Sequence, residues 1–347
     1  MTHTAWWPHT TQDRIASYRL RCRQVIESLT SRGLDVGLFD SKASPPACLV
    51  LSKRYDARSL ATACDLRQRA GTRLVLDLCD NHFWFSDDPT GHLARRRDDL
   101  VQACNAVDLV IAASESLGDV VRAETSARDI VVVPDAAESP SAPHWSVRWR
   151  HPKEQWQMIR LRRWMSRTGI DRARRLVWFG NQGSSGVEGG MGDLSSIASA
   201  LKSAHARKPL SLTVISNSAS RHAEVTAGWP LPTFYLPWSS RTFSEALSLH
   251  SAAVIPIQRN PFTTCKTANR LLSASLHGLN TLADNIPSYT PFRACSVLDD
   301  WDFALGGYLD QAERRSLDVQ HARALAMNDY SIEQIADRWR QALELTP

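Results

Sequence analysis

A glycine-rich segment follows an apolar run near the middle of the chain. Six of the sixteen glycines fall within residues 180–192, directly after the apolar residues 176–179. A strand, a glycine loop and a helix start at Asp193 would let backbone N–H groups approach an anion without interference from Cβ atoms. The spacing matches neither the dinucleotide fingerprint nor the P-loop. The segment therefore predicts a phosphate-binding loop, with a plain flexible connection as the alternative.

A second polar cluster lies about seventy-five residues further on. An apolar strand at residues 252–257 leads through a loop to a predicted helix at 266–277, which Gly278 would cap. Three polar residues would share its first turn: Lys266, Asn269 and Arg270. Two cations and an amide suit a diphosphate and the hydroxyls of a sugar. A capped, solvated helix start is the alternative.

Several motifs in this half resemble the donor domain of bacterial GT-B glycosyltransferases similar to glycosyltransferase family 4. They are Trp178-Phe-Gly-Asn, Gly190-Met-Gly-Asp-Leu, Asn260-Pro-Phe and Lys266-Thr-Ala-Asn-Arg. The resemblance covers residues 175–345 and implies two Rossmann-like, doubly wound α/β domains facing a central cleft. It implies a nucleotide-sugar in the C-terminal domain and an acceptor against the N-terminal one. The donor-binding residues would then be Gly180, Asn181, Gly183, Gly190, Met191, Lys266, Asn269 and Arg270.

The chain also departs from this family. Family 4 commonly carries two glutamates, and aligning its capping glycine with Gly278 places them at Cys265 and Ser273, where no carboxylate stands. The family's Arg and Lys pair after the first donor-domain strand is missing as well, with Asn181 near the Arg position. Lys266 and Arg270 would then neutralise the diphosphate. Loss of catalysis is the alternative.

Length and composition fit two soluble domains. The 347 residues suit two units of about 150 residues each. No apolar stretch approaches the ~20 residues that span a bilayer, and the N-terminus lacks a signal-peptide pattern, so we expect a cytoplasmic protein. Seven scattered cysteines without C-x-x-C spacing predict reduced thiols rather than a zinc site or disulfides. We expect no bound metal and no cofactor beyond the nucleotide-sugar substrate.

The first half alternates predicted helices and strands. The helices are expected at residues 15–30, 59–70 and 114–123, and the strands at 36–39, 47–51, 73–78, 107–112 and 130–133. Apolar strands without polar alternation belong in a parallel sheet that is covered on both faces. Ligands of such domains bind beyond the carboxyl ends of the strands.

Two groups in this half are candidates for contact with the acceptor. Asp80 and His82 follow the strand at 73–78, and either could accept a proton from a sugar hydroxyl. Alternatively, Asp80 caps a turn and His82 packs beside the aromatic residues that follow it. Tyr18 and Arg19 resemble a family segment that lines the cleft. Arg19 or Arg21 could contact an anionic acceptor, or form a surface salt bridge instead.

A basic, tryptophan-rich segment follows a Pro and Ser linker at residues 139–143. Its arginines and lysines are interleaved with four tryptophans, Trp145, Trp149, Trp156 and Trp164. Pro152 opens its predicted helix. Residues 145–167 could lie on an anionic membrane, at the inner face. They could equally pack their tryptophans on a domain and leave their arginines in water, which we favour. The net charge of the whole chain is only +5, so the basicity is confined to this segment, and no nucleic-acid-binding motif accompanies it.

The chain divides into four predicted parts. Residues 1–138 form the acceptor domain, 139–171 the linker and basic helix, 172–326 the donor domain, and 327–347 a last helix with Ser331 as its cap. On the resemblance, that helix crosses back to the first domain. A simple terminal helix on the second domain would show the same pattern.

These patterns together favour a metal-independent glycosyltransferase of the hexosyltransferase type. The acceptor, whether a glycan, a lipid-linked molecule or a protein, stays open, and Lys266 would stabilise the departing diphosphate. Family 4 implies retention of configuration, but the missing glutamates leave the stereochemistry open. The alternative is a non-catalytic GT-B-like protein that binds a sugar nucleotide or a partner enzyme. A nicotinamide-dependent oxidoreductase is disfavoured because its fingerprint is absent.

Overall fold

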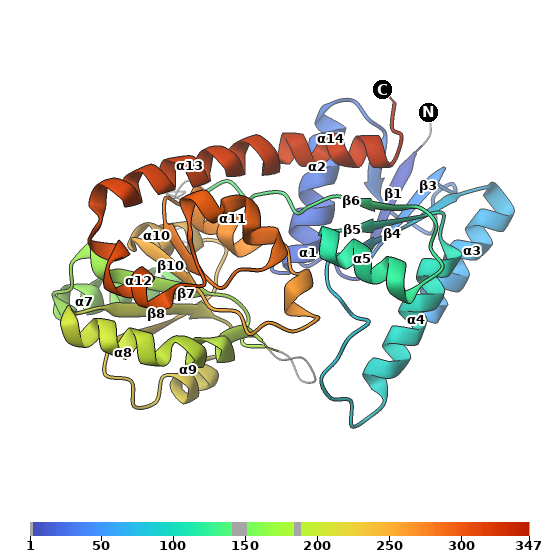
Figure 1. The fold of residues 1–347 in the computed structure, drawn as a ribbon. Coiled ribbons are helices and arrows are strands. Elements are labelled where there is room, and N and C mark those ends of the chain that lie inside the picture. The colour runs from blue at the N-terminus through green and yellow to red at the C-terminus, as the bar shows by residue number, and fades with distance from the viewer. Residues whose placement is uncertain (1–2, 141–150, 184–188, 347) are drawn as a thin grey trace.

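The computed structural model describes residues 3–140, 151–183 and 189–346, and places them in two lobes (Figure 1). Each lobe is built on a six-stranded parallel sheet, with strand orders β2-β1-β3-β4-β5-β6 and β12-β11-β10-β7-β8-β9. Both sheets have buried apolar side chains on both faces, in four separate clusters. The expected doubly wound α/β class is confirmed, because parallel sheets need cover on both sides.

The first sheet contains one strand that the sequence patterns did not predict. Its strands are β1 (Thr4–Pro8), β2 (Val36–Leu38), β3 (Cys48–Ser52), β4 (Arg73–Leu78), β5 (Leu109–Ala112) and β6 (Ile130–Val132). The unpredicted β1 pairs with both β2 and β3, and its Trp6 is fully buried. Its five residues hold two tryptophans and a proline, so no run of branched apolar residues indicates a strand.

Helices cover this sheet on both faces. They are α1 (Ala16–Tyr18), continued by a π-helical segment η1 (Arg19–Arg23), then α2 (Gln24–Ser31), α3 (Ala57–Ala70), α4 (His92–Ala106) and α5 (Glu115–Glu124). The predicted cap of α5 is confirmed, since the Ser114 side chain accepts a bond from the Leu117 N–H. The helix α3 begins two residues earlier than predicted because Asp56 caps it. The helix α4 was not predicted.

The second sheet has strands at the two segments predicted above, residues 176–179 and 252–257, whereas its strands at residues 211–216, 233–237 and 297–298 were not predicted. Its strands are β7 (Arg175–Phe179), β8 (Ser211–Ser216), β9 (Thr233–Pro237), β10 (Ala252–Ile255), β11 (Asn280–Ala283) and β12 (Val297–Leu298). Its helices are α7 (Pro152–Thr168), α8 (Ala198–Arg207), α9 (Ala219–Val225), α10 (Phe243–Ser248), α11 (Asn269–Leu276), α12 (Trp301–Gly306) and α13 (Ala312–Tyr330). Shorter helical turns are η2 (Arg172–Arg174), η3 (Gly190–Ile197), η4 (Thr263–Cys265), η5 (Pro287–Cys295) and η6 (Tyr308–Asp310).

The basic helix α7 packs on the second lobe, beside β9. Three of its side chains enter that core, Met158, Leu161 and Met165. The Trp164 ring packs 5.2 Å from the ring of Phe234. Packing of all the tryptophans on a domain is the favoured interpretation, but Trp156 does not follow this expectation, because it is 56% exposed. Trp145 and Trp149 lie outside the described residues.

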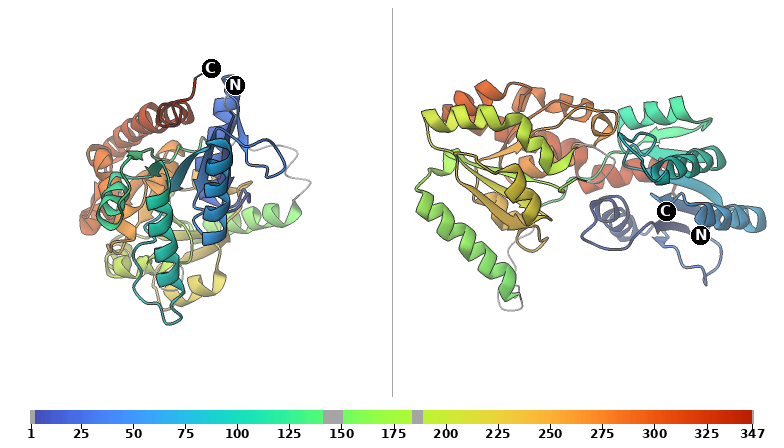
Figure 2. Two further views of the ribbon diagram at one scale, coloured as in Figure 1. Left: turned by 90° about the vertical axis from the view of Figure 1, so that its right-hand side faces the viewer. Right: turned by 90° about the horizontal axis from the view of Figure 1, so that it is seen from below.

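The last two helices run along one side of both lobes, shown in red in Figure 1. The helix α13 packs against α11 of the second lobe and ends at Tyr330. The final helix α14 (Ile332–Ala342) packs against α2 of the first lobe, with the Trp339 and Trp6 rings 5.7 Å apart. The predicted cap Ser331 is confirmed by its bond from the Gln334 N–H. Figure 2 shows the two chain ends near each other on the first lobe.

Candidate functional site

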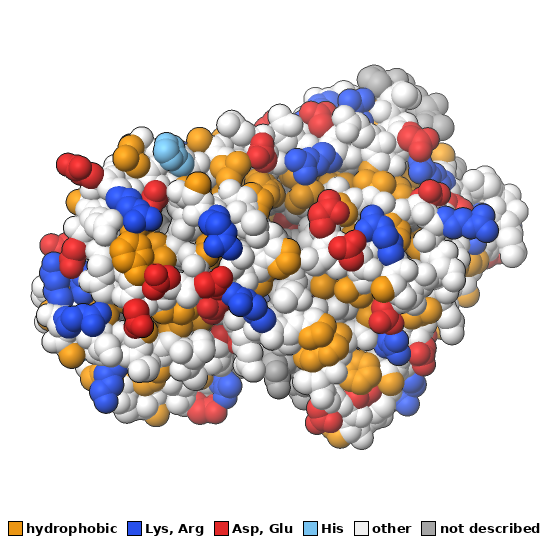
Figure 3. Space-filling view, viewed as in Figure 1, with side chains coloured by type: hydrophobic (Ala, Val, Ile, Leu, Met, Phe, Trp, Pro, Cys, Tyr) orange, Lys and Arg blue, Asp and Glu red, His pale blue; other side chains and the backbone are white. Residues whose placement is uncertain are grey.

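The two sheets direct the carboxyl ends of their strands toward a common seam. The segment after β10 contacts the first lobe through several hydrogen bonds, three of which involve the ends of β4, β5 and β6. These three run from Asn81 Nδ2 to the Pro261 carbonyl (2.9 Å), from Ser114 Oγ to the Cys265 carbonyl (2.8 Å), and from Thr267 Oγ1 to Asp135 Oδ2 (2.7 Å). The space-filling view shows a notch between the lobes beside this seam (Figure 3). By the rule for parallel sheets, this seam is the candidate active site.

The glycine loop closes tightly on itself at the end of β7. Gly183 and Gly190 have φ values of +109° and +87°, which favour glycine. A Cβ on Gly190 would lie 2.6 Å from the Gly183 nitrogen, and one on Gly183 would lie 2.8 Å from the Gly189 carbonyl oxygen. Residues 184–188 lie outside the described residues. The glycines therefore permit close approach of the two loop ends.

Asp193 fixes the second end of this loop. Its Oδ2 accepts a bond from the Gly190 N–H at 3.1 Å. Burial raises the pKa of this carboxyl to about 6, although the charge of Arg270 acts in the opposite direction. The predicted helix start at Asp193 is wrong, because the chain first forms the η3 turn and α8 begins only at Ala198.

The predicted donor residues fall into two environments. Met191 is fully buried in the second core, so its side chain offers no surface to a ligand. Asn181 is exposed and accepts a bond from Asn217 Nδ2 at 3.2 Å. A Cβ on Gly180 would lie 3.7 Å from Arg270 Nη1. The glycine loop and α11 are therefore brought together, as a shared phosphate site requires.

The second polar cluster begins differently from the prediction. The helix α11 starts at Asn269, whose Oδ1 accepts a weak bond from Ser273 Oγ at 3.5 Å, and Gly278 follows its end with φ +72°. Lys266 precedes the helix in an extended conformation, with ψ at 150°. The predicted helical start at Lys266 is wrong because tertiary contacts hold residues 266–267 against the first lobe.

Lys266 forms an ion pair with Asp80 across the seam. The same carboxylate pairs with Lys53, which follows β3. The Asp80 side chain is 16% exposed, and that of Lys266 is 37% exposed. Burial of Asp80 opposes ionisation, but the two lysine charges hold its pKa well below the usual range. Asp80 is therefore an ionised carboxylate with two ammonium partners rather than a free base in this state.

His82 lies in a hydrogen-bonded network beside this pair. Arg96 Nε donates to the Tyr55 hydroxyl oxygen at 2.7 Å, and that hydroxyl lies 2.6 Å from His82 Nδ1. Burial, reinforced by the charge of Lys53, lowers the pKa of His82 to about 3. The imidazole is neutral, and we assign its proton to Nε2 because Nδ1 accepts from the phenol. Its predicted role as a base is not favoured by this arrangement, since the basic nitrogen is occupied.

The predicted acceptor residues of the first helix are largely enclosed. Tyr18 is 8% exposed within the first core, so its predicted acceptor contact is not supported. Arg19 lies at the seam, pairs with Glu138 and has its guanidinium 5.6 Å from the Trp238 ring centroid. Arg21 is fully buried and cannot meet an acceptor. It is part of a structural ion-pair network instead.

Of the two positions that lack the family's glutamates, Cys265 lies at this seam and Ser273 lies within the second lobe. Cys265 is 2% exposed and packs in the core of the first lobe, where Asn81 Nδ2 lies 3.7 Å from its Sγ. Ser273 is 7% exposed on α11. Within the described residues, no group of three His, Cys, Asp or Glu side chains could hold a metal ion.

Sequence reasoning missed three residues of the seam. Lys53 and Tyr55 follow β3 directly, so the strand-end rule that selected Asp80 could have found them. Arg96 lies on the unpredicted α4, and no sequence signal pointed to it.

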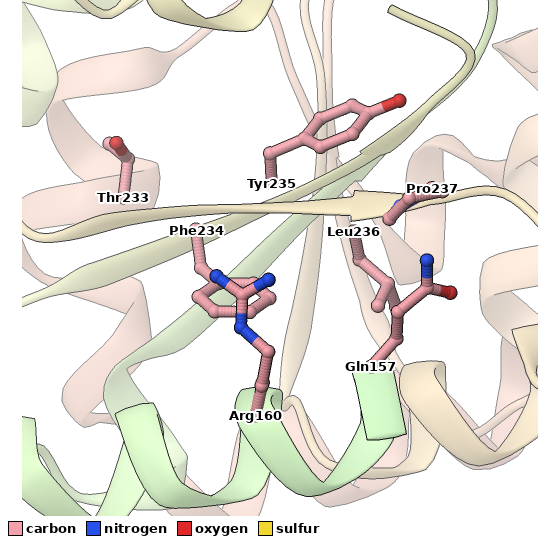
Figure 4. Close-up of a pocket in the computed structure, with 7 residues that line it drawn as sticks. All are labelled: Gln157, Arg160, Thr233, Phe234, Tyr235, Leu236 and Pro237. Carbon is pink, nitrogen blue, oxygen red and sulfur yellow. The ribbon is translucent and has the colours of Figure 1, made fainter. Parts of the chain in front are cut away.

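A separate pocket lies at the edge of the second sheet. It has a volume of about 260 Å³ between α7 and the edge strand β9. Figure 4 shows the Arg160 guanidinium beside the Phe234 ring, and Gln157 below Leu236. None of the predicted donor or acceptor residues lines it.

Comparisons with known proteins identify the architecture. HepE of Anabaena, solved with UDP and glucose, has a TM-score of 0.63 at 12% identity, covering 99% of both chains. TarM has a TM-score of 0.61 at 10% identity, covering 92% of this chain and 57% of that one. The pneumococcal O-GlcNAc transferase GtfA, solved with UDP and GlcNAc, has a TM-score of 0.55 at 12% identity, covering 86% of this chain and 56% of that one.

These likenesses show the fold. The two-domain GT-B architecture expected from the sequence motifs is confirmed. The chain spans a little over half the length of TarM and GtfA and the full length of HepE. No family model matches the chain, and no curated protein matches its sequence.

The glycine loop yields the first testable prediction. We expect Gly190→Val to abolish binding of a nucleoside diphosphate while circular dichroism stays native, because its Cβ would meet Gly183 at 2.6 Å. Binding is measured by calorimetry. Gly228→Val is the control, since Gly228 has φ +70° but open space around its Cβ. Normal binding in Gly190→Val would reduce the loop to a connector.

Proposed function

We propose that this protein transfers a sugar from a nucleotide-sugar donor to an acceptor hydroxyl. The convergence of the glycine loop and Arg270 at the carboxyl edge of the second sheet, opposite Asp80, carries the proposal. Support comes from two GT-B neighbours that were solved with a nucleotide and a sugar, HepE with UDP and glucose and GtfA with UDP and GlcNAc. Uridine diphosphate is accordingly the first nucleotide to test.

Arg270, Asn269 and the loop N–H groups bind the donor in this proposal. The diphosphate lies between the glycine loop and α11, where Arg270 Nη1 approaches the start of the loop. Asn181 and Asn269 contact the nucleotide or sugar hydroxyls. Guanidinium, ammonium and backbone N–H groups stabilise the charge that develops on the leaving diphosphate, which makes a metal ion unnecessary.

Lys266 exchanges partners when the donor binds. In the structure it pairs with Asp80, which retains Lys53 as a second partner if Lys266 leaves. A diphosphate carries more negative charge than one carboxylate, so it competes for the ammonium group. Release of Lys266 removes one of the two charges that lower the Asp80 pKa. Asp80 thereby becomes more basic at the moment when the donor is in place.

We expect Lys266→Ala to weaken nucleoside diphosphate binding by about 1.5–3 kcal/mol, the range for one charge-assisted contact. Thermal shifts with UDP and other nucleoside diphosphates measure it, because a ligand at 100 times its Kd stabilises the folded state by about 2.7 kcal/mol. Lys208→Ala is the control, since Lys208 pairs with Asp310 away from the seam. Unchanged affinity in Lys266→Ala with a loss in Arg270→Ala would assign the phosphates to Arg270 alone.

The missing glutamates favour a second candidate function, a non-catalytic protein that binds a sugar nucleotide or a partner enzyme. Cys265 and Ser273 provide no carboxylate at either position. The two functions are separated by incubating the chain with the nucleotide-sugar that it binds. Neither hydrolysis nor transfer from that compound would favour the binding protein. Where transfer occurs, the anomeric configuration of the product tests the retention that the family resemblance implies.

Contact with an anionic membrane through residues 145–167 is a further part of the proposal, as is a cytoplasmic location at the inner face. In the described part of this segment, Trp156 and Ile159 are 56% and 43% exposed, and the Arg160 guanidinium lies 4.7 Å from the Trp156 ring centroid. No helix among the described residues is long and apolar enough to cross a membrane. We expect co-sedimentation with anionic vesicles and a loss in Trp156→Ala. Equal binding to neutral vesicles would contradict it.

A further inference from the structure

A group of cationic and imidazole side chains lies at the carboxyl edge of the first sheet, outside the donor site. We call it the basic cluster and define it as His9, Lys53, Arg54, His82 and Arg96. It draws on the ends of β1, β3 and β4 and on α4, so four separate elements place these groups together. The carboxylate beside the basic cluster is that of Asp80. It already pairs with Lys53 of the cluster and with Lys266 of the second lobe.

Arg54 is held rigidly by neutral groups. Its Nε and Nη2 both donate to the Pro8 carbonyl oxygen, at 3.0 and 2.8 Å, and Nη1 donates to Ser59 Oγ at 3.2 Å. Its guanidinium also lies 4.8 Å from the Trp7 ring centroid. No salt bridge to Arg54 is found among the described residues. Its charge is therefore fixed in place, and it acts on the nearby Asp56, whose pKa it helps to lower, without forming a direct ion pair with it.

Arg96 has the same character. Nε donates to the Tyr55 hydroxyl at 2.7 Å, and Nη2 lies 3.2 Å from His82 Nδ1. Both partners are neutral, and within the described ranges Arg96 has no carboxylate partner. Its Nη1 makes no hydrogen bond to the described part of the chain. The side chain is half-buried rather than fully solvated, so its charge is less screened than that of a surface arginine.

The two histidines report the same positive potential. Burial lowers the pKa of His9, and the charges of Lys53, Arg54 and Arg96 lower it further. Burial and the charges of Lys53 and Arg96 act in the same direction on His82. Both imidazoles are neutral at physiological pH, and Arg96 Nη2 lies 3.4 Å from His82 Nε2, so Arg96 Nη1 rather than the imidazole is the group that donates to an oxygen anion. A rigid group of positive charges with a free guanidinium N–H is the arrangement that binds an oxyanion.

We propose that the basic cluster binds a phosphate or carboxylate group carried by the acceptor. This inference rests on the proposed function, because the cluster adjoins Asp80, which pairs with Lys266 of the donor side. An anion bound at Arg96 and Arg54 would place the remainder of the acceptor along the seam. The acceptor is then an anionic sugar or a phosphorylated molecule rather than a neutral glycan.

Calorimetry with saturating UDP tests the inference, because UDP occupies the donor phosphate site and leaves the basic cluster open. The probes are inorganic phosphate, glucose 6-phosphate and glucuronate, with glucose as the neutral control. We expect at least one anionic probe to bind more tightly than glucose. Arg96→Gln should weaken that probe by roughly 10- to 100-fold, the effect of one charge-assisted bond, and leave UDP affinity unchanged. Tighter binding of glucose 6-phosphate would indicate that the acceptor carries a phosphate group, and tighter binding of glucuronate would indicate a carboxylate.

Arg95→Gln is the matched control, since Arg95 lies on the same helix, is exposed and loses the same charge. An equal loss in Arg95→Gln and Arg96→Gln, or equal binding of glucose and the anionic probes, would overturn the inference. If Arg96→Gln does not fold, His9→Gln serves instead because His9 is exposed, and a weaker but selective loss of the anion is expected.

Failure of the proposed function remains distinguishable. If UDP does not bind, the same titrations are made without it in Arg270→Ala, which lacks the donor-side guanidinium. Binding of an anion that depends on Arg96 would then support the basic cluster alone, and its absence would overturn it.

Discussion

Arg21→Ala should lower the free energy of unfolding by about 3–5 kcal/mol, the cost of removing one member of a buried ion pair. Arg21 is fully buried. Its Nε donates to Asp77 Oδ1 at 2.7 Å and its Nη1 to Asp135 Oδ1 at 3.0 Å. The alanine variant leaves two carboxylates without their countercharge in the core of the first lobe. The shift of the urea midpoint measures the loss.

The neighbouring Arg23 provides the control for this prediction. Arg23 belongs to the same π-helical segment, but its side chain is 35% exposed and pairs with the exposed Asp13 at 3.1 Å. Arg23→Ala should therefore cost less than about 1 kcal/mol. Equal losses in the two variants would show that the segment, rather than the buried ion pair, determines the effect.

The burial of Arg21 also affects the seam between the lobes. Asp135 accepts a bond from Thr267 of the second lobe at 2.7 Å. When Arg21 is absent, Asp135 loses the guanidinium that binds its Oδ1 at 3.0 Å and holds the carboxylate in place. We therefore expect the position of the segment after β10 to depend on a residue that never meets a substrate.

Asp80→Asn should reduce sugar transfer by roughly 10²- to 10⁴-fold, the usual contribution of a positioned acid or base. Asparagine keeps the size of the side chain but cannot accept the proton of an acceptor hydroxyl. Nucleotide affinity should be retained or increased, because Lys266 loses its competing partner. Transfer is measured with saturating donor, and nucleotide affinity is measured separately by calorimetry.

Asp108→Asn controls for lost stability in this experiment. Asp108 accepts a bond from the Leu74 N–H at 2.7 Å and pairs with Arg67, at the opposite edge of the first sheet. Its asparagine variant should keep normal transfer. His82→Gln separates the two predicted acceptor residues, and we expect a smaller effect because His82 Nδ1 is occupied by Tyr55. Transfer within a few-fold of wild type in both Asp80→Asn and His82→Gln would exclude the base role.

The sequence by itself determined the class of fold and most of its elements. Continuous apolar strands required parallel sheets with cover on both faces, and the structure has two of them. Ser114 and Ser331 were recognisable as helix caps because a cap depends on residues three positions apart. The elements that escaped prediction are β1, β8, β9, β12, α4, α9, α10, α12 and α13. Among them, β1 and α4 carry no strong apolar period.

Only the tertiary structure decided how the candidate site is assembled. Lys266 and Asp80 are 186 positions apart, so no local pattern could indicate their ion pair. Nor could it indicate the extended conformation of Lys266 before α11. The burial of Arg21 could not be predicted for the same reason. The local sequence around a helical arginine is the same whether its side chain faces water or two buried carboxylates. Local patterns depend on backbone geometry over a few residues, whereas charge pairing depends on contacts between distant elements. Docking of the two lobes brings Lys266 to Asp80, and folding of the first lobe brings Arg21 to Asp77 and Asp135.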